Sequence, residues 1–117
     1  MRGVRRFLRR LQAAFSGIFA AFRSETHLKI HAAAACAVIA AGVWLRISRG
    51  DWVVLSLTIA AVIALELVNT AIERTVDLVM KERHPLAKQA KDTAAGAVLV
   101  MAMASVIIGI LIFTKYL

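Results

Sequence analysis

The chain of 117 residues has one cysteine, one proline and seven acidic residues. A single cysteine excludes an intrachain disulfide. No G-x-x-x-x-G-K-S/T or G-x-G-x-x-G segment occurs, which excludes the phosphate loops of P-loop ATPases and protein kinases. Apolar residues make up 61% of the chain, and the mean hydropathy is +0.76. So short and apolar a chain leaves no room for a separate soluble domain, and it indicates a small integral membrane protein.

Three apolar stretches have the length of a membrane span. They cover residues 30–47, 52–72 and 93–114. About 20 apolar residues cross a hydrocarbon core of about 30 Å as a helix. We therefore expect an all-α integral membrane protein whose single domain occupies residues 1–117.

Positive charge is distributed unevenly around these spans, and the net charge is +8. Twelve of the 15 lysines and arginines precede the first span or lie between the second and third. Only Arg46, Arg49 and Lys115 lie on the other side. Because cytoplasmic loops carry the excess of Lys and Arg, we expect a cytoplasmic N-terminus and an external C-terminus.

Residues 1–28 are expected to form an amphipathic cytoplasmic surface segment rather than a span. Helical projection places Phe7, Leu11, Phe15, Ile18 and Phe22 on one face. The opposite face carries the arginines, which suit anionic headgroups: Arg2, Arg5, Arg6, Arg9 and Arg10. Two interpretations stay open, a basic anchor with no further duty and an arginine that holds a nucleotide phosphate.

A polar stripe closes the second span. At 100° per residue, Glu66, Asn69, Glu73 and Asp77 fall within roughly 80° of arc on one helix face. A charge near the bilayer centre costs about 2.5–3.5 kcal/mol on insertion scales, so such residues usually serve a function. This stripe predicts a site for cations, a phosphate-bound metal or a moving proton.

The depth of the stripe places that site near the cytoplasmic face. Glu66 follows Trp52 by 14 residues, which is about 21 Å of helix. Glu25 precedes the first span, and Lys91 and Asp92 are expected to open the third, with Asp92 as its N-cap. We also expect Asp51 to cap the second span, and His84-Pro85 to end it.

This arrangement suits phosphoryl transfer from ATP to a lipid alcohol. Glu66 is deep enough to meet the hydroxyl, and burial makes a glutamate a better proton acceptor at neutral pH. Glu25 and Glu73, at the boundary, suit Mg²⁺. A small proton-coupled transporter that uses Glu66 alone, and a structural or regulatory membrane subunit, remain as alternatives.

His27 and His31 have the i, i+4 spacing of metal ligands. No third ligand stands at a fixed spacing from them. We therefore interpret both as histidines of the membrane interface rather than as a zinc site.

The stripe also carries a family resemblance. Residues 66–77, ELVNTAIERTVD, together with Ala90-Lys91-Asp92 and Glu25, resemble the bacterial diacylglycerol kinase/undecaprenol kinase family. The resemblance implies a homotrimer in the bacterial inner membrane, with active sites at subunit interfaces and Mg²⁺ as cofactor. It further implies Glu66 as proton acceptor for the lipid, Glu25 and Glu73 as Mg-ATP ligands, and Asn69 and Asp77 as support. The implied nucleotide contacts are Arg6, Glu82, Arg83, His84, Lys91 and Asp92, and Lys91 is also implied as a catalytic residue.

Within that family, two lipid substrates compete. Residues 25–31 (ETHLKIH) and 84–98 (HPLAKQAKDTAAGAV) look more like the undecaprenol kinases. Diacylglycerol kinases tend to have glycine-serine where Ala94-Ala95 stand, and an aromatic residue at the place of Ala13. We therefore expect undecaprenol as the substrate, with diacylglycerol as the alternative. No nucleic-acid partner is expected.

Overall fold

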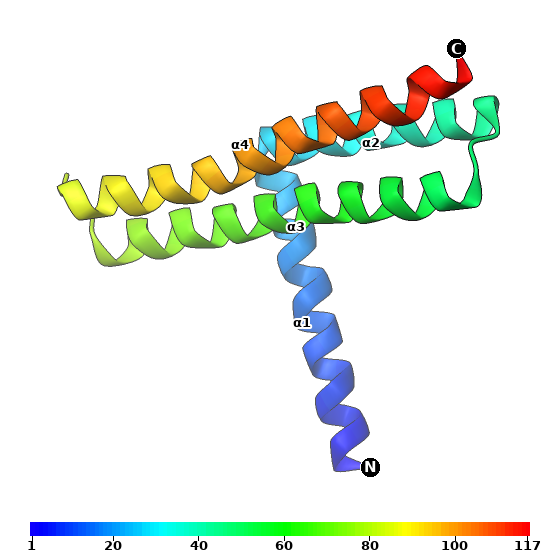
Figure 1. Ribbon diagram of the computed structural model, residues 1–117. Coiled ribbons are helices and arrows are strands. Elements are labelled where there is room, and N and C mark those ends of the chain that lie inside the picture. The colour runs from blue at the N-terminus through cyan, green and yellow to red at the C-terminus, as the bar shows by residue number, and fades with distance from the viewer.

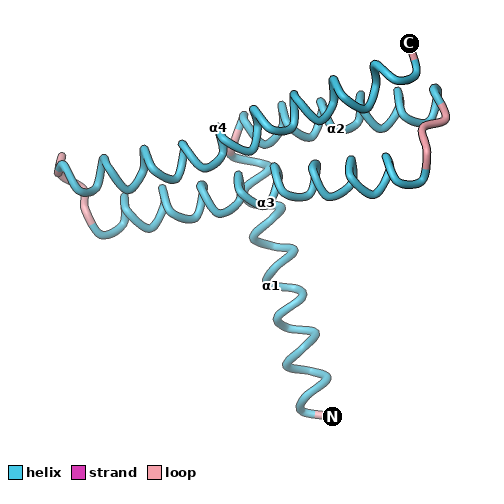
Figure 2. The backbone as a smooth tube through the Cα atoms, viewed as in Figure 1, coloured by secondary structure: helices cyan, strands magenta, loops and turns pink.

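The computed structural model describes residues 1–117 and consists of helices alone. In chain order these are α1 (Arg2–Ser24), α2 (Thr26–Leu45), α3 (Arg49–Val79), α4 (Pro85–Phe113) and a 3₁₀ turn, η1 (Thr114–Tyr116). Short loops join them (Figure 2). Helices α2, α3 and α4 are long and apolar enough to cross a membrane. The predicted all-α fold, with three helices long and apolar enough to span a membrane, is confirmed.

The four helices have unequal lengths, and this decides the shape of the molecule (Figure 1). With 20 residues, α2 measures about 30 Å, whereas the 31 residues of α3 measure about 46 Å. Helices α3 and α4 are antiparallel and pack along their length, while α2 accompanies only part of α3. Helix α1 leaves this bundle steeply at the point where α2 begins. The connected ends of α3 and α4 therefore extend past the α1–α2 junction.

The turn between α2 and α3 differs from the expected one. Helix α2 ends at Leu45, two residues before the predicted limit, because Arg46 adopts the left-handed conformation with φ 53°. The Ser48 side chain caps α3 by accepting from the Asp51 backbone N–H at 3.1 Å. The prediction of Asp51 as the cap is wrong, since Ser48 stands three residues earlier with a suitable hydroxyl.

The second turn also differs. Helix α3 ends at Val79, and His84-Pro85 begins α4 instead of ending α3. His84 caps α4 because its Nδ1 accepts from the Leu86 N–H at 3.1 Å, and Pro85 occupies the first turn, where its missing N–H is not needed. Asp92 therefore lies two turns inside α4, and its prediction as an N-cap is wrong.

The small core lies at the end of the bundle that holds the C-terminus. Ile47, Leu55 and Ile112 form its buried cluster. Nearby, Gly42 faces the Trp52 ring so closely that an added Cβ would stand 2.8 Å from Trp52 Cη2. Elsewhere α2, α3 and α4 expose many large apolar side chains, which suits a surface covered by lipid or by other copies of the chain.

Candidate functional site

The polar stripe of α3 runs from a buried end to an exposed end. Glu66 is buried and only 7% exposed, whereas Asn69 and Glu73 are half-buried. Asp77, one turn after Glu73, is exposed. The stripe thus joins the apolar interior of the bundle to the extension formed by α3 and α4.

At the buried end, Glu66 faces a histidine from the neighbouring helix. His31 Nε2 of α2 lies 3.2 Å from Glu66 Oε1. The sequence alone indicates only an interfacial histidine at position 31 and does not predict this contact. A depth comparison shows only that the contact is possible, because His31 and Glu66 lie at similar distances from the turn that joins α2 and α3.

In the middle of the stripe, Asn69 and Glu73 form a polar pair. The Asn69 Nδ2–H donates to Glu73 Oε1 at 3.1 Å. Asn69 Oδ1 is buried and has no hydrogen-bond partner within the chain. Buried polar oxygens normally have a partner, so this atom marks a place where a donor or a cation fits.

Glu25 stands at the junction of α1 and α2, where it is the residue that separates the two helices. Arg74 of α3 approaches it, with Nη2 3.9 Å from Glu25 Oε1. The same guanidinium donates a hydrogen bond to Ser24 Oγ. Arg74 therefore ties the α1–α2 junction to α3 and holds Glu25 next to the stripe. Sequence reasoning counted Arg74 only as a topology charge.

At the exposed end, Asp77 of α3 forms an ion pair with Lys91 of α4. This pair lines a broad concavity with a volume of about 840 Å³. Its lining includes five of the predicted residues: Asp77, Glu82, Arg83, His84 and Lys91. The structure thus brings four of the predicted nucleotide contacts to one surface at the tip of the α3–α4 extension: Glu82, Arg83, His84 and Lys91.

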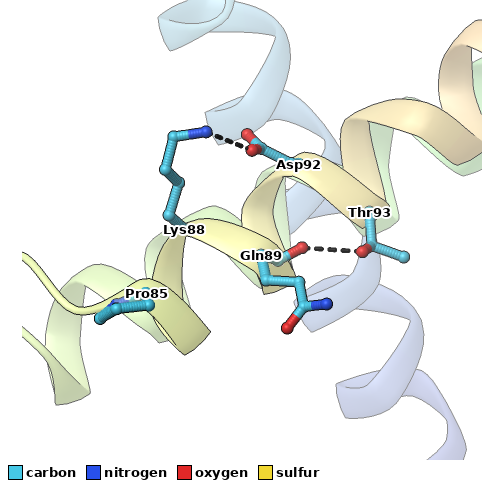
Figure 3. Close-up of a pocket in the computed structure, with 5 residues that line it drawn as sticks. All are labelled: Pro85, Lys88, Gln89, Asp92 and Thr93. Carbon is cyan, nitrogen blue, oxygen red and sulfur yellow. Dashed lines mark hydrogen bonds and ion pairs between the residues drawn. The ribbon is translucent and has the colours of Figure 1, made fainter.

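Asp92 faces a different side of α4. It forms an ion pair with Lys88 Nζ at 2.5 Å and lines a smaller concavity of about 440 Å³. Figure 3 shows this pair together with Pro85, Gln89 and Thr93. Within one chain, Lys91 and Asp92 therefore do not point at a common ligand.

Arg6 is the predicted residue that lies farthest from the others along the fold. It belongs to the exposed part of α1, whose only buried residue is Ala21. Figure 1 shows this part of α1 directed away from the bundle. No contact within the chain brings Arg6 to the stripe.

The chain holds no group of three or more His, Cys, Asp or Glu side chains arranged for a metal ion. Mg²⁺ at phosphoryl-transfer sites, however, typically takes only one or two carboxylates, with the remaining ligands from substrate phosphates and water. The Glu73 carboxylate beside the unpartnered Asn69 Oδ1 is an oxygen set of that kind. These residues therefore fit a metal that enters with a nucleotide.

Comparison with known proteins gives consistent similarities. Residues 12–113 match the family model described as prokaryotic diacylglycerol kinase. The chain is 50% identical over 108 residues to the undecaprenol kinase of Bacillus subtilis (strain 168), covering 92% of this chain and 88% of that one. It is 45% identical over 97 residues to a diacylglycerol kinase of Synechocystis, covering 82% of this chain and 55% of that one.

A third relative, a diacylglycerol kinase of Pseudomonas aeruginosa, is 36% identical over 95 residues, covering 81% of this chain and 77% of that one. The resemblance expected from the Glu66–Asp77 motif is confirmed.

Proposed function

Because the chain belongs to the prokaryotic diacylglycerol kinase family, and is therefore a membrane lipid kinase, we propose that it phosphorylates undecaprenol with ATP. The B. subtilis relative, 50% identical over most of the chain, supports this lipid. The alternative is diacylglycerol, which the names of two other relatives contain. The kinase family removes the motivation for a proton-coupled transporter, which was the more remote alternative.

The observation that carries this proposal is the gradient along α3. A buried carboxylate, Glu66, stands at the level of an apolar groove, and ion pairs and exposed charges follow within three turns. A lipid hydroxyl arrives from the apolar side and a nucleotide from the polar side. With such a gradient, the lipid reaches the site without entering water, and the charged nucleotide reaches it without entering the apolar interior of the membrane.

In the proposed reaction, the lipid oxygen attacks the γ-phosphorus of ATP. The new O–P bond forms as the bond between the γ-phosphorus and the β–γ bridging oxygen breaks, which yields ADP and the lipid phosphate. Glu66 accepts the hydroxyl proton and later releases it to water. A general base in this position typically contributes about 10²–10⁴-fold to the rate.

We assign the nucleotide to the surface around Asp77 and Lys91, with Glu82, Arg83 and His84 from the loop. Lys91 would release Asp77 to bind phosphate oxygens, while Asp77 and Asn69 support the arrangement. Glu25 and Glu73 would hold Mg²⁺, which supplies charge neutralisation for the phosphates when bound. Asp92 and Arg6 complete the proposed nucleotide contacts.

We further propose a homotrimer with active sites at subunit interfaces. The different directions of Lys91 and Asp92, and the distance of Arg6 from the stripe, support it. A neighbouring copy would complete each site with residues that one chain does not bring together. The exposed apolar faces of α2, α3 and α4 offer the surface for such packing.

Membrane placement follows from the same features. We propose that α1 is an amphipathic helix on the cytoplasmic surface of the bacterial inner membrane, because it leaves the three spanning helices steeply. The N-terminus and the α3–α4 turn would then lie in the cytoplasm and the C-terminus outside. The distribution of Lys and Arg supports this orientation.

The experiment compares rates of phosphate transfer from Mg-ATP to undecaprenol and to diacylglycerol, using protein purified into lipid. We expect faster transfer to undecaprenol. Faster transfer to diacylglycerol would reverse the substrate assignment, and no transfer to either lipid would overturn the kinase proposal.

The matched variant for the base is Glu66→Gln, which keeps the shape of the side chain and removes the proton acceptor. Turnover should fall by about 10²-fold or more, while nucleotide binding stays within about twofold. Near-normal turnover would show that Glu66 is not the base.

A further inference from the structure

His31 is half-buried and contacts Glu66, the proposed base. It has no role in the proposed reaction. We propose that His31 is a positioning residue, which orients the Glu66 carboxylate toward the lipid hydroxyl. This inference rests on the proposed function, because it assumes that Glu66 is the proton acceptor.

The contact between these two side chains is exclusive. His31 Nε2 lies 3.2 Å from Glu66 Oε1, and no other charged side chain lies within 4.0 Å of this carboxylate. No side-chain or backbone donor forms a hydrogen bond with it either. The side chain of Glu66 is 9% exposed, and that of His31 is 26% exposed. In such surroundings, one imidazole N–H has a large influence on where the carboxylate points.

The contact leaves the second carboxylate oxygen available. His31 touches Oε1, so Oε2 can accept the hydroxyl proton of the substrate. A neutral imidazole can carry its hydrogen on Nε2, the atom that faces Oε1. Catalytic hydrogen bonds often tighten only when substrate is bound, so the 3.2 Å contact is close enough for this role.

His31 also lies at the apolar groove of the bundle. It lines a groove of about 110 Å³ between α2, α3 and α4, and small residues form much of the wall. These small residues include Ala34, Ala35, Ser105 and Gly109. His31 therefore both contacts the Glu66 carboxylate and lines the apolar groove from which we propose that the lipid alcohol approaches.

The sequence offers a matched control one turn earlier. His27 lies four residues before His31 on α2, is exposed, and has no ion pair or side-chain hydrogen bond. Substitution of His27 tests the loss of a histidine near the membrane surface without loss of the Glu66 contact.

The experiment uses three variants of the full chain in lipid, His31→Gln, His31→Leu and His27→Leu, with undecaprenol and Mg-ATP as substrates. The Gln side chain places an amide N–H near the position of Nε2, whereas Leu offers none. We expect His31→Leu to lower kcat by about 10-fold or more, which is less than the about 10²–10⁴-fold that a general base contributes. The KM for Mg-ATP should stay within about twofold of the wild-type value. His31→Gln should retain most of the rate, and His27→Leu should match the wild type.

A double variant separates positioning from packing. If His31 acts through Glu66, then His31→Leu combined with Glu66→Gln should be no slower than Glu66→Gln alone. A purely structural role predicts a further loss and a lower unfolding midpoint in sodium dodecyl sulfate for both His31 variants.

Distinct outcomes overturn distinct claims. A wild-type rate in His31→Leu, or equal losses in His31→Leu and His31→Gln, would overturn the positioning role while leaving the kinase intact. If His31→Leu fails to fold, His31→Asn replaces it, because the Asn side chain is too short for its amide to reach the Glu66 carboxylate. Equal rates for His31→Asn and His31→Gln would also overturn the positioning role. An inactive wild type would count against the proposed function instead.

Discussion

Lys115, in the 3₁₀ turn after α4, contacts both carboxylate oxygens of Asp51 near the start of α3, at 2.9 and 2.8 Å. The Tyr116 hydroxyl donates to the same carboxylate at 2.6 Å and accepts from the Ser48 backbone N–H at 2.8 Å. These bonds fasten the C-terminal turn to the loop between α2 and α3. The end of the molecule opposite the candidate site is therefore closed by polar contacts around one buried carboxylate.

We expect Asp51→Asn to lower stability without a direct effect on the reaction. The amide loses the charge that pairs with Lys115 and one of the two acceptor oxygens. The unfolding midpoint in sodium dodecyl sulfate should fall, while KM for Mg-ATP remains unchanged. Arg49→Gln, in the same turn but without an ion pair, is the control. Equal midpoints for the two variants would contradict the role of this network.

Gly42→Ala should destabilise the same end of the molecule through a clash. An added Cβ at position 42 would meet Trp52 Cη2 at 2.8 Å and Ile47 Cδ1 at 3.2 Å. Overpacking of this kind typically costs about 1–3 kcal/mol. Gly96→Ala is the control, because its Cβ would meet nothing within 4 Å. Thermal unfolding in detergent should separate the two variants, and equal melting temperatures would show that Trp52 moves aside without cost.

Glu73→Gln should weaken Mg²⁺ binding at the proposed metal site and leave the proposed base, Glu66, in place. The variant keeps a side chain that the Asn69 amide can contact but removes the charge that attracts Mg²⁺. We expect the Mg²⁺ concentration for half-maximal rate to rise by about 10-fold or more, since charge-assisted contacts are worth roughly 1.5–3 kcal/mol. ATP protection against unfolding should require the same higher Mg²⁺. A normal Mg²⁺ requirement would exclude Glu73 as a ligand.

Lys91→Met should weaken nucleotide binding and leave lipid binding unaffected. The variant loses the cation that pairs with Asp77 on the nucleotide surface. We expect KM for Mg-ATP to rise about 10-fold, as for other lost charge-assisted contacts, with KM for the lipid within about twofold. Lys29→Met, which removes an exposed lysine without an ion pair, provides the comparison. A higher KM for lipid instead would place Lys91 elsewhere in the reaction.

The amino-acid sequence was sufficient to predict the spans and the stripe, because both follow from helical periodicity and apolar length. Glu66, Asn69, Glu73 and Asp77 share one helix, so their mutual arrangement needs no knowledge of packing. The helix ends were harder to predict. Ser48 and His84, rather than Asp51 and Asp92, cap the helices, because several neighbouring residues have suitable side chains and local geometry selects among them.

Contacts between helices depend on which faces pack together, and no periodicity within one helix contains that information. His31 lies 13 residues before Trp44 and Glu66 lies 14 residues after Trp52, so both stand about 20 Å from the same turn. Equal depth made their contact geometrically possible. Only the packing of α2 on α3 determines that the two side chains face each other.

The short second helix has a consequence for the surrounding lipid. Helix α1 leaves the bundle at one end of α2, and the turn around Ser48 lies at the other end. The length of α2 therefore separates the α1–α2 junction from this turn by about 30 Å. The depth of Glu66 is therefore fixed by the protein. In a membrane of thicker hydrocarbon, the bilayer must thin around the bundle or the substrate hydroxyl must lie farther from Glu66. With Glu66 as the proposed base, we expect turnover to depend on the thickness of the host membrane as well as on the substrate concentration.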